Sequence, residues 1–238
     1  MTHPPKAIFF DLDDTLISFD GVSVPVWQAC CTETVTRFHL PVSPQALWDA
    51  VRARKDWFWS DPERHRIGRL DNGAAQRDIV ADAMAGLGLE DMEAAHFLAD
   101  SYAIKRQEAV CLFPRSLETL AALRARGVRL ALLTNGTAGE QRRKIERFGL
   151  EPYFERILIE GELGFGKPDR RFFLLALERM GLLPHEAWMV GDNLSWEIVP
   201  ARELGLTAIW NDWRGAGLPE GSAARPHRII RDVGELLW

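Results

Sequence analysis

A short apolar run that ends in an aspartate constrains the fold of this chain more than any other feature. Residues 7–10 are Ala-Ile-Phe-Phe, and they lead directly into Asp11. Because no polar residue alternates with the apolar ones, the run is typical of a strand buried on both faces, as in a parallel sheet covered by helices. The run therefore predicts an α/β fold.

The second half of the chain repeats this theme. Apolar runs predict further strands, and amphipathic stretches that end near glycines predict helices between them. The alternation predicts a three-layer, doubly wound parallel sheet, whose ligand site lies beyond the carboxyl ends of the strands. The predicted strands cover residues 128–133, 156–159, 187–190, 206–210 and 229–230, and the predicted helices cover residues 117–126, 138–148, 172–180 and 196–204.

The stretch from residue 19 to residue 110 does not follow this alternation. Its pattern is helical, with segments at 46–51, 75–87 and 93–108. An earlier segment places Val26, Ala29, Cys30, Val35 and Phe38 on one helix face. We therefore predict a discontinuous core domain, residues 1–18 and 111–238, interrupted by an α-helical domain of residues 19–110.

Composition excludes several classes of protein. The chain carries 29 Lys and Arg against 34 Asp and Glu, a net charge of −5 without a polybasic block, which argues against nucleic acid or an anionic membrane as the main partner. The sequence has no run of about 18 apolar residues, so we predict no transmembrane helix. The first six residues lack the apolar region of a signal peptide. Cys30, Cys31 and Cys111 form no CxxC pair, so we expect reduced, packed thiols and a cytoplasmic location.

The first motif with chemistry is Asp11-Leu12-Asp13-Asp14-Thr15. An extended backbone has a period of two, so Asp11 and Asp13 project from the same side at the end of the strand. One carboxylate then serves as a nucleophile and the other as a general acid and base, as transfer through an aspartyl phosphate requires. The alternative is an acidic turn in which Asp14 caps the next helix.

Two further motifs offer groups that neutralise a phosphate. Thr134, Asn135 and the backbone N–H groups of their turn form a neutral anion cradle at a strand end, unless this is an ordinary turn into a helix. Pro168 favours an extended conformation for Lys167, which is then aimed at a phosphate or, alternatively, lies on the surface.

The last motif is Gly191-Asp192-Asn193, followed by Glu197. Asp192 ends a buried strand, where a carboxylate needs a compensating charge. Mg²⁺ fits this place, because it prefers oxygen ligands and takes one or two protein carboxylates. Capping of the following helix by Asp192 is the competing interpretation.

Together these motifs resemble those of the haloacid dehalogenase-like hydrolase superfamily, and the insert is similar to the helical C1-type cap of its subfamily I. The resemblance implies a Rossmann-like core, Mg²⁺ and an Asp11-phosphate intermediate. It implies that Asp13 acts as the acid and base, and that Thr134, Asn135 and Lys167 bind the phosphate. The implied metal ligands are Asp11, the backbone carbonyl of Asp13, and Asp192, supported by Asn193 and Glu197.

The predicted activity is hydrolysis of phosphate monoesters. A carbon–halogen hydrolase of the same superfamily is less favoured, because a halide leaves without the proton that Asp13 supplies. A phosphomutase and a non-catalytic phosphate-binding domain remain as alternatives.

The insert is expected to act as a lid that admits only small phosphorylated metabolites. Within it, Arg64, Arg66 and Arg69 are candidates for binding an anionic part of the substrate, or else solvated helix ends. Arg142-Arg143-Lys144 is interpreted as a helix face, because Glu140 and Glu146 flank it. The sequence leaves the oligomeric state open.

Overall fold

A computed structural model describes residues 4–237. The chain divides into two compact units. The core unit combines the chain up to Ser18 with the chain from Cys111 onward, and the inserted unit is Phe19–Val110.

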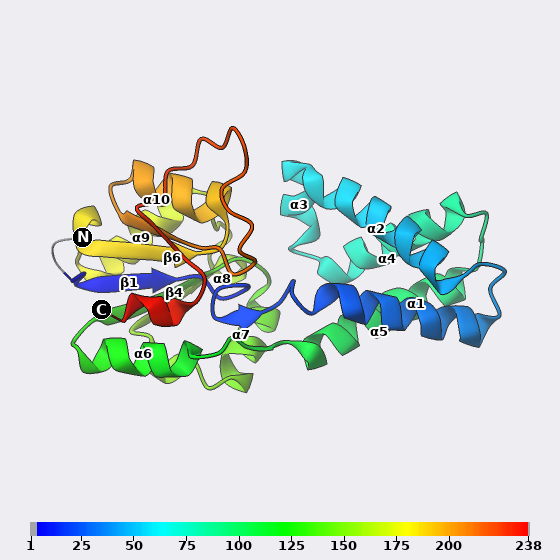
Figure 1. Cartoon of the computed structure of the whole chain (residues 1–238), viewed down its shortest axis with the longest axis horizontal. Helices are drawn as coiled ribbons and strands as arrows, with labels where there is room; N and C mark the ends of the chain where they lie inside the picture. The colour runs from blue at the N-terminus through cyan, green and yellow to red at the C-terminus, as the bar shows by residue number, and fades with distance from the viewer. Residues whose placement is uncertain (1–3, 238) are drawn as a thin grey trace. The chain divides into compact units, whose positions relative to one another are not determined.

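The core unit is built on a parallel sheet. Within the described residues the sheet has six strands in the order β5-β4-β1-β6-β7-β8. The buried run at the start of the chain, β1, occupies an inner position with β4 on one side and β6 on the other (Figure 1). The strands are β1 (Ala7–Phe10), β4 (Arg129–Thr134), β5 (Arg156–Ile159), β6 (Ala187–Gly191), β7 (Thr207–Asn211) and β8 (Arg228–Ile230).

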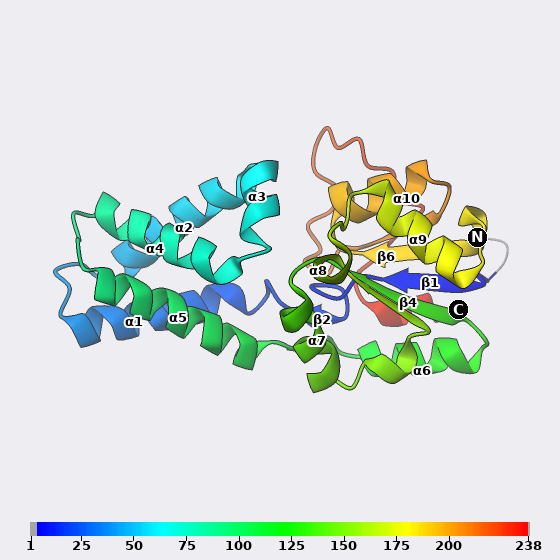
Figure 2. The ribbon, with the colours of Figure 1, turned by 180° about the vertical axis from the view of Figure 1, so that it is seen from behind.

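Helices cover both faces of this sheet (Figure 2). Phe9 and Met189 pack on one face against Phe172 and Phe173 of α9. On the other face α6 packs against β4. These layers confirm the predicted doubly wound fold. The helices are α6 (Ser116–Ala125), α7 (Ala138–Arg147), α8 (Glu160–Leu163), α9 (Arg170–Met180) and α10 (Val199–Glu203), and the short turns are η1 (Glu151–Tyr153), η2 (Pro184–Glu186), η3 (Leu194–Ile198) and η4 (Val233–Leu236).

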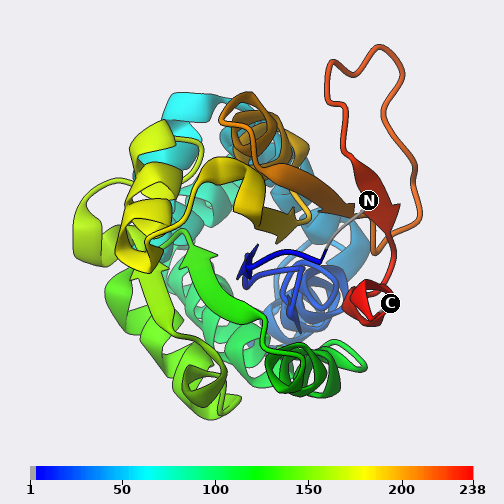
Figure 3. The ribbon, with the colours of Figure 1, turned by 90° about the vertical axis from the view of Figure 1, so that its left-hand side faces the viewer.

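Two features of the core unit lie outside the predicted pattern. The chain leaves and re-enters the core unit through two short strands, β2 (Ile17–Ser18) and β3 (Cys111–Leu112). These strands pair antiparallel, with Ile17 opposite Leu112. Two-residue strands carry no periodicity, so the sequence gives no sign of them. A long loop, residues 212–227, extends from the body of this unit between β7 and β8 (Figure 3).

The inserted unit is helical and has its own core. Trp27 stacks on Tyr102 with ring centroids 3.7 Å apart, and the Tyr102 hydroxyl lies 2.8 Å from Ser23 Oγ. Both aromatic side chains are almost fully buried. The helices are α1 (Ser23–Phe38), α2 (Pro44–Ser60), α3 (Pro62–Gly68), α4 (Asn72–Gly86) and α5 (Met92–Ala109).

Several details of the sequence interpretation were wrong. Ala29 is exposed on α1, because the buried face turns toward Trp27, Cys31 and Thr34 instead. Cys111 is an exposed free thiol on β3, whereas Cys30 and Cys31 are buried as expected.

Among the described residues, no helix is both long and apolar enough to cross a bilayer.

Asp14 does not cap a helix. Its backbone φ is 61°, and its N–H donates to the carbonyl of Ile17 at 2.7 Å. The next helix begins only at Ser23. Asp14 therefore closes a tight turn that returns the chain toward β2.

Candidate active site

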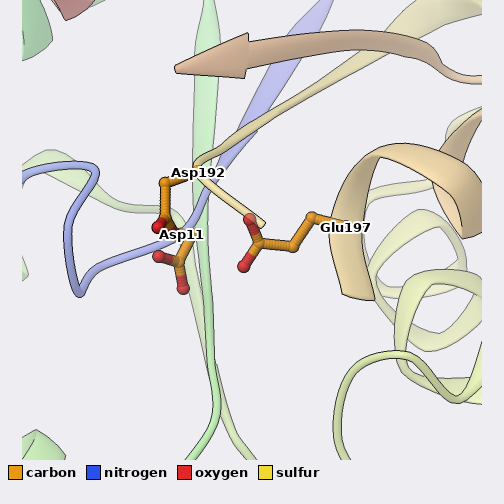
Figure 4. A group of neighbouring side chains, drawn as sticks. All are labelled: Asp11, Asp192 and Glu197. Carbon is orange, nitrogen blue, oxygen red and sulfur yellow. The ribbon is translucent and has the colours of Figure 1, made fainter. Parts of the chain in front are cut away.

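The carboxyl ends of two neighbouring strands bring three acidic side chains together. Asp11 follows β1 and Asp192 follows β6, and the Asp11 N–H donates to the carbonyl of Val190 at 3.0 Å. One carboxylate oxygen each of Asp11, Asp192 and Glu197 lies within 4.8 Å of the others (Figure 4). The sheet register therefore unites the first and last motifs.

Glu197 reaches this group because the turn after β6 is held from both ends. Asn193 Oδ1 accepts the N–H groups of Ser195 and Trp196, both at 3.0 Å. In return, Glu197 Oε2 accepts the Asn193 N–H at 2.9 Å. Asn193, and not Asp192, is thus the residue that caps the turn, which the sequence left open.

Gly191 is needed for the same arrangement. A Cβ atom at this position would lie 1.9 Å from Glu197 Oε2. Only glycine leaves room for the carboxylate to fold back against the end of β6.

Lys167 is fully enclosed by these acids. It is 1% exposed, and its Nζ donates to Asp11 Oδ1 and, at 2.7 Å, to Glu197 Oε1. The alternative of a surface lysine was therefore wrong.

The backbone of Lys167 is fixed by Asn135. The Lys167 N–H donates to Asn135 Oδ1 at 2.8 Å, and Asn135 Nδ2 donates to the Lys167 carbonyl at 2.7 Å. Gly166 allows this approach, because a Cβ there would lie 2.5 Å from Asn135 Oδ1. Asn135 thus spends its amide oxygen and one N–H on positioning Lys167.

The electrostatics of this cluster favour a divalent cation. Burial and then the negative charge of Glu197 raise the pKa of Asp11 to about 8, even though Lys167 acts in the opposite direction. Burial and then the negative charges of Glu197, Asp11 and Asp14 raise the pKa of Asp192 as well. Burial opposes the charge of Lys167, but Asp11 and Glu197 outweigh it and hold its pKa above the usual range. One ammonium does not compensate three carboxylates, so ionising all of them is unfavourable without a further cation, and carboxylate oxygens are the ligands that Mg²⁺ prefers.

Asp13 points to a different set of partners. Lys144 Nζ donates to both of its carboxylate oxygens, at 2.8 and 2.9 Å, and Gln141 Nε2 donates to one of them at 3.0 Å. Gln141 Nε2 also donates to Thr134 Oγ1 and, at 2.8 Å, to the Asn135 carbonyl. Asp13 and the Thr134–Asn135 turn are therefore linked through α7.

Sequence reasoning missed Gln141 and misread Lys144. Lys144 was grouped with Arg142 on one charged helix face, yet its side chain is only 15% exposed and contacts Asp13. The signal was available in the spacing: residues three apart share a helix face, and this helix follows the Thr134–Asn135 turn directly.

The backbone of the predicted phosphate cradle is partly engaged. The Gly136 N–H donates to Glu160 Oε2 at 3.0 Å. The Gly136 N–H is therefore already occupied by a carboxylate of the protein, whereas the sequence analysis expected the N–H groups of this turn to face a bound anion. Thr134 is 1% exposed at the end of β4, and its phosphate-binding role stays a prediction.

The three cap arginines lie within the inserted unit, in or next to α3. Arg64 donates to the carbonyls of Phe58 and Trp57, at 3.2 and 2.7 Å. Arg66 forms two hydrogen bonds with Glu63, at 2.9 and 2.6 Å. Arg69 follows the last residue of α3. These contacts account for Arg64 and Arg66 locally, and a role in binding substrate stays a prediction.

Known proteins match this chain over most of its length. The sequence pattern of the haloacid dehalogenase-like hydrolases matches residues 5–205. The chain belongs to this family. Among known hydrolases, N-acylneuraminate-9-phosphatase of Rattus norvegicus is 29% identical over 232 residues, which cover 97% of this chain and 92% of that enzyme. Phosphoserine phosphatase of Thermus thermophilus is 42% identical over 144 residues, 60% of this chain and 57% of that enzyme, so the chain spans little more than half of that relative.

Solved structures of the same family share the fold. The HAD-hydrolase YfnB from Bacillus subtilis, solved bound to magnesium, superposes with a TM-score of 0.72 at 21% identity, covering 97% of this chain and 96% of that one. A 2-haloacid dehalogenase from Pseudomonas syringae is 29% identical, with a TM-score of 0.62 and 98% coverage of both chains.

Proposed function

We propose that this haloacid dehalogenase-like hydrolase is a Mg²⁺-dependent phosphatase that releases inorganic phosphate from small phosphorylated metabolites. The observation that carries the proposal is the position of Lys167 between Asp11 and Glu197, with Asp192 beside them at the carboxyl edge of the sheet. Related chains that are named phosphatases support the same reaction class.

In this proposal Asp11 is the nucleophile. A carboxylate oxygen of Asp11 forms a bond to phosphorus while the bond from phosphorus to the leaving oxygen breaks. Asp13 gives a proton to that oxygen. Asp13 then takes a proton from water, whose oxygen attacks the phosphorus of the acyl phosphate and regenerates Asp11.

The other residues stabilise the charge of the transferring group. Lys167 would offer a buried ammonium to the phosphoryl oxygens, and Thr134 and the second N–H of the Asn135 amide are proposed as further donors. Asp11, Asp192 and the backbone carbonyl of Asp13 would hold the metal. Asn193 and Glu197, which are hydrogen-bonded to each other, would position these ligands. When bound, Mg²⁺ neutralises the phosphate charge and the excess of carboxylates.

A panel of phosphorylated metabolites tests this function. With Mg²⁺ present, we expect release of inorganic phosphate from at least one small substrate, scored by kcat/KM, and loss of that activity in EDTA. Efficient turnover of an intact phosphoprotein with every small metabolite inert would contradict the proposed substrate class. Transfer of phosphate between sugar phosphates would instead indicate a phosphomutase. If calorimetry shows that this protein binds neither Mg²⁺ nor a mimic of the phosphate transition state, the result would favour a non-catalytic domain.

Carbon–halogen hydrolysis is the second candidate, because one similar structure is a 2-haloacid dehalogenase. A halide leaves without a proton, so that reaction has no use for a carboxylate two residues after the nucleophile. Here Asp13 occupies that position with two side-chain donors on it. Dehalogenation of a 2-halo acid without Mg²⁺ would reverse this order of preference.

A cytoplasmic location also stays a proposal.

A further inference from the structure

We infer that Gln141 and Lys144 are positioning residues that orient Asp13 for proton transfer to the leaving oxygen. The inference rests on the proposed function, in which Asp13 is the general acid. Neither residue belongs to the motifs that supply Asp11, Asp13, Lys167 and Asp192, and both contact Asp13 from α7.

The contact is more specific than an ordinary surface ion pair. Lys144 Nζ reaches both carboxylate oxygens of Asp13, at 2.8 and 2.9 Å, and the two side chains are 15% and 25% exposed. Exposed pairs adopt many geometries and contribute little. Two donors from one ammonium and a third from Gln141, at 3.0 Å, restrict rotation of the carboxylate.

Gln141 gives this restraint a fixed reference. Gln141 is 1% exposed, and the two N–H groups on its Nε2 are shared among Asp13 Oδ2, Thr134 Oγ1 and the Asn135 carbonyl. The acid is therefore held relative to the turn that is proposed to bind the phosphate. A proton donor must lie within hydrogen-bond reach of the leaving oxygen, so this relative placement decides whether transfer succeeds.

The same helix offers a contrast on its other face. Arg142 turns outward to Glu162, with hydrogen bonds of 2.7 and 2.9 Å, and its side chain is 44% exposed. Arg143 is exposed as well. Substitution of Arg143 therefore controls for charge on α7 without touching Asp13.

The leaving group provides a readout that a purely structural role would not change. In the first step the P–O bond breaks and its electron pair goes to the leaving oxygen, which then needs the proton of Asp13. A nitrophenolate leaves readily without that proton, whereas an unsubstituted or methoxy-substituted phenolate depends on it. Loss of positioning must therefore harm phenyl phosphates with poor leaving groups most.

We would measure kcat/KM for a series of para-substituted phenyl phosphates, from nitro to methoxy. For Lys144→Met we expect a loss of about tenfold or more with the methoxy compound but less than about threefold with the nitro compound. Lys144→Arg should restore most of the loss, because a guanidinium can also bond both carboxylate oxygens. Arg143→Met should behave as the wild type.

Equal losses across the series for Lys144→Met, or no loss, would overturn the inference. If Lys144→Met does not fold, as judged by its thermal midpoint, Lys144→Gln tests the same point, because it removes the charge and keeps one donor. The Asp13→Asn variant distinguishes a failure of this inference from a failure of the proposed function. If Asp13→Asn shows the leaving-group dependence and the Lys144 variants do not, only the inference fails. If Asp13→Asn shows no such dependence either, the proposed function fails with it.

Discussion

A Cβ atom on Gly191 would lie 1.9 Å from Oε2 of Glu197, so the end of β6 and the acidic cluster depend on each other. Gly191→Ala should force Glu197 away from the Asn193 N–H and from Lys167, with which it now forms hydrogen bonds of 2.9 and 2.7 Å. We expect the free energy of unfolding to fall by about 3 kcal/mol. Urea denaturation measures this change, and wild-type stability in the variant would contradict the packing described.

Gly86→Ala is the matched control. Gly86 ends α4, and nothing lies within 4 Å of a Cβ atom there. We expect a small gain, about 0.5 kcal/mol, because alanine loses less backbone freedom on folding than glycine.

The effect of Mg²⁺ on stability should depend on pH. The Asp11 carboxyl has an ordinary pKa of 3.8, which the folded site raises to about 8. The folded protein therefore holds this proton more tightly than the unfolded chain, so without metal the free energy of unfolding falls as pH rises from about 4 to about 8. Mg²⁺ competes with the same proton, so it should stabilise the protein most where the proton is absent.

Thermal midpoints with Mg²⁺ and with EDTA, at about pH 6 and about pH 8.5, measure this effect. We expect a clearly larger rise with Mg²⁺ at the higher pH. Asp192→Asn is the control and should reduce the rise at the higher pH. An equal rise at both pH values would mean that the metal does not bind at these carboxylates.

The inserted unit offers a separate test. The Tyr102 hydroxyl lies 2.8 Å from Ser23 Oγ and accepts from Arg106 Nη1 at 3.2 Å, all in a buried setting. Tyr102→Phe should lower the free energy of unfolding by about 1.5 kcal/mol, because it leaves Ser23 and Arg106 without this partner.

The double variant with Ser23→Ala shows whether that loss comes from the named contact. Its destabilisation should be smaller than the two single effects added together, because both changes remove the same hydrogen bond. Strict additivity, measured by urea denaturation, would place the effect elsewhere.

The sheet could be predicted because its strands are short apolar runs, and the four inner ones, β1, β4, β6 and β7, are almost entirely buried. The predicted strand at 156–159 coincides with β5, and the run at 187–190 differs from β6 only by Gly191. Prediction failed for elements without such a pattern. The two-residue strands β2 and β3 are too short to show periodicity, and α3 is a single short helix between two longer segments.

The candidate site was predictable in its residue types but not in its contacts. Asp11, Lys167 and Asp192 follow strand ends or lie in a loop beside them, so the topology alone brings them together. The partners of Asp13 required the rotation of α7, which decides that Lys144 turns inward and Arg142 outward. Only tertiary packing fixes that rotation.

The hydrolysis rate of Asp11→Asn tests the central claim most directly. In the proposed reaction the Asp11 carboxylate forms the bond to phosphorus, and an amide cannot replace it. With Mg²⁺ present and 4-nitrophenyl phosphate as substrate, kcat of this variant should fall below about 1% of the wild-type value, since removal of a nucleophile costs several powers of ten. A variant that folds as the wild type and keeps more than about 1% of its kcat would contradict nucleophilic catalysis by Asp11.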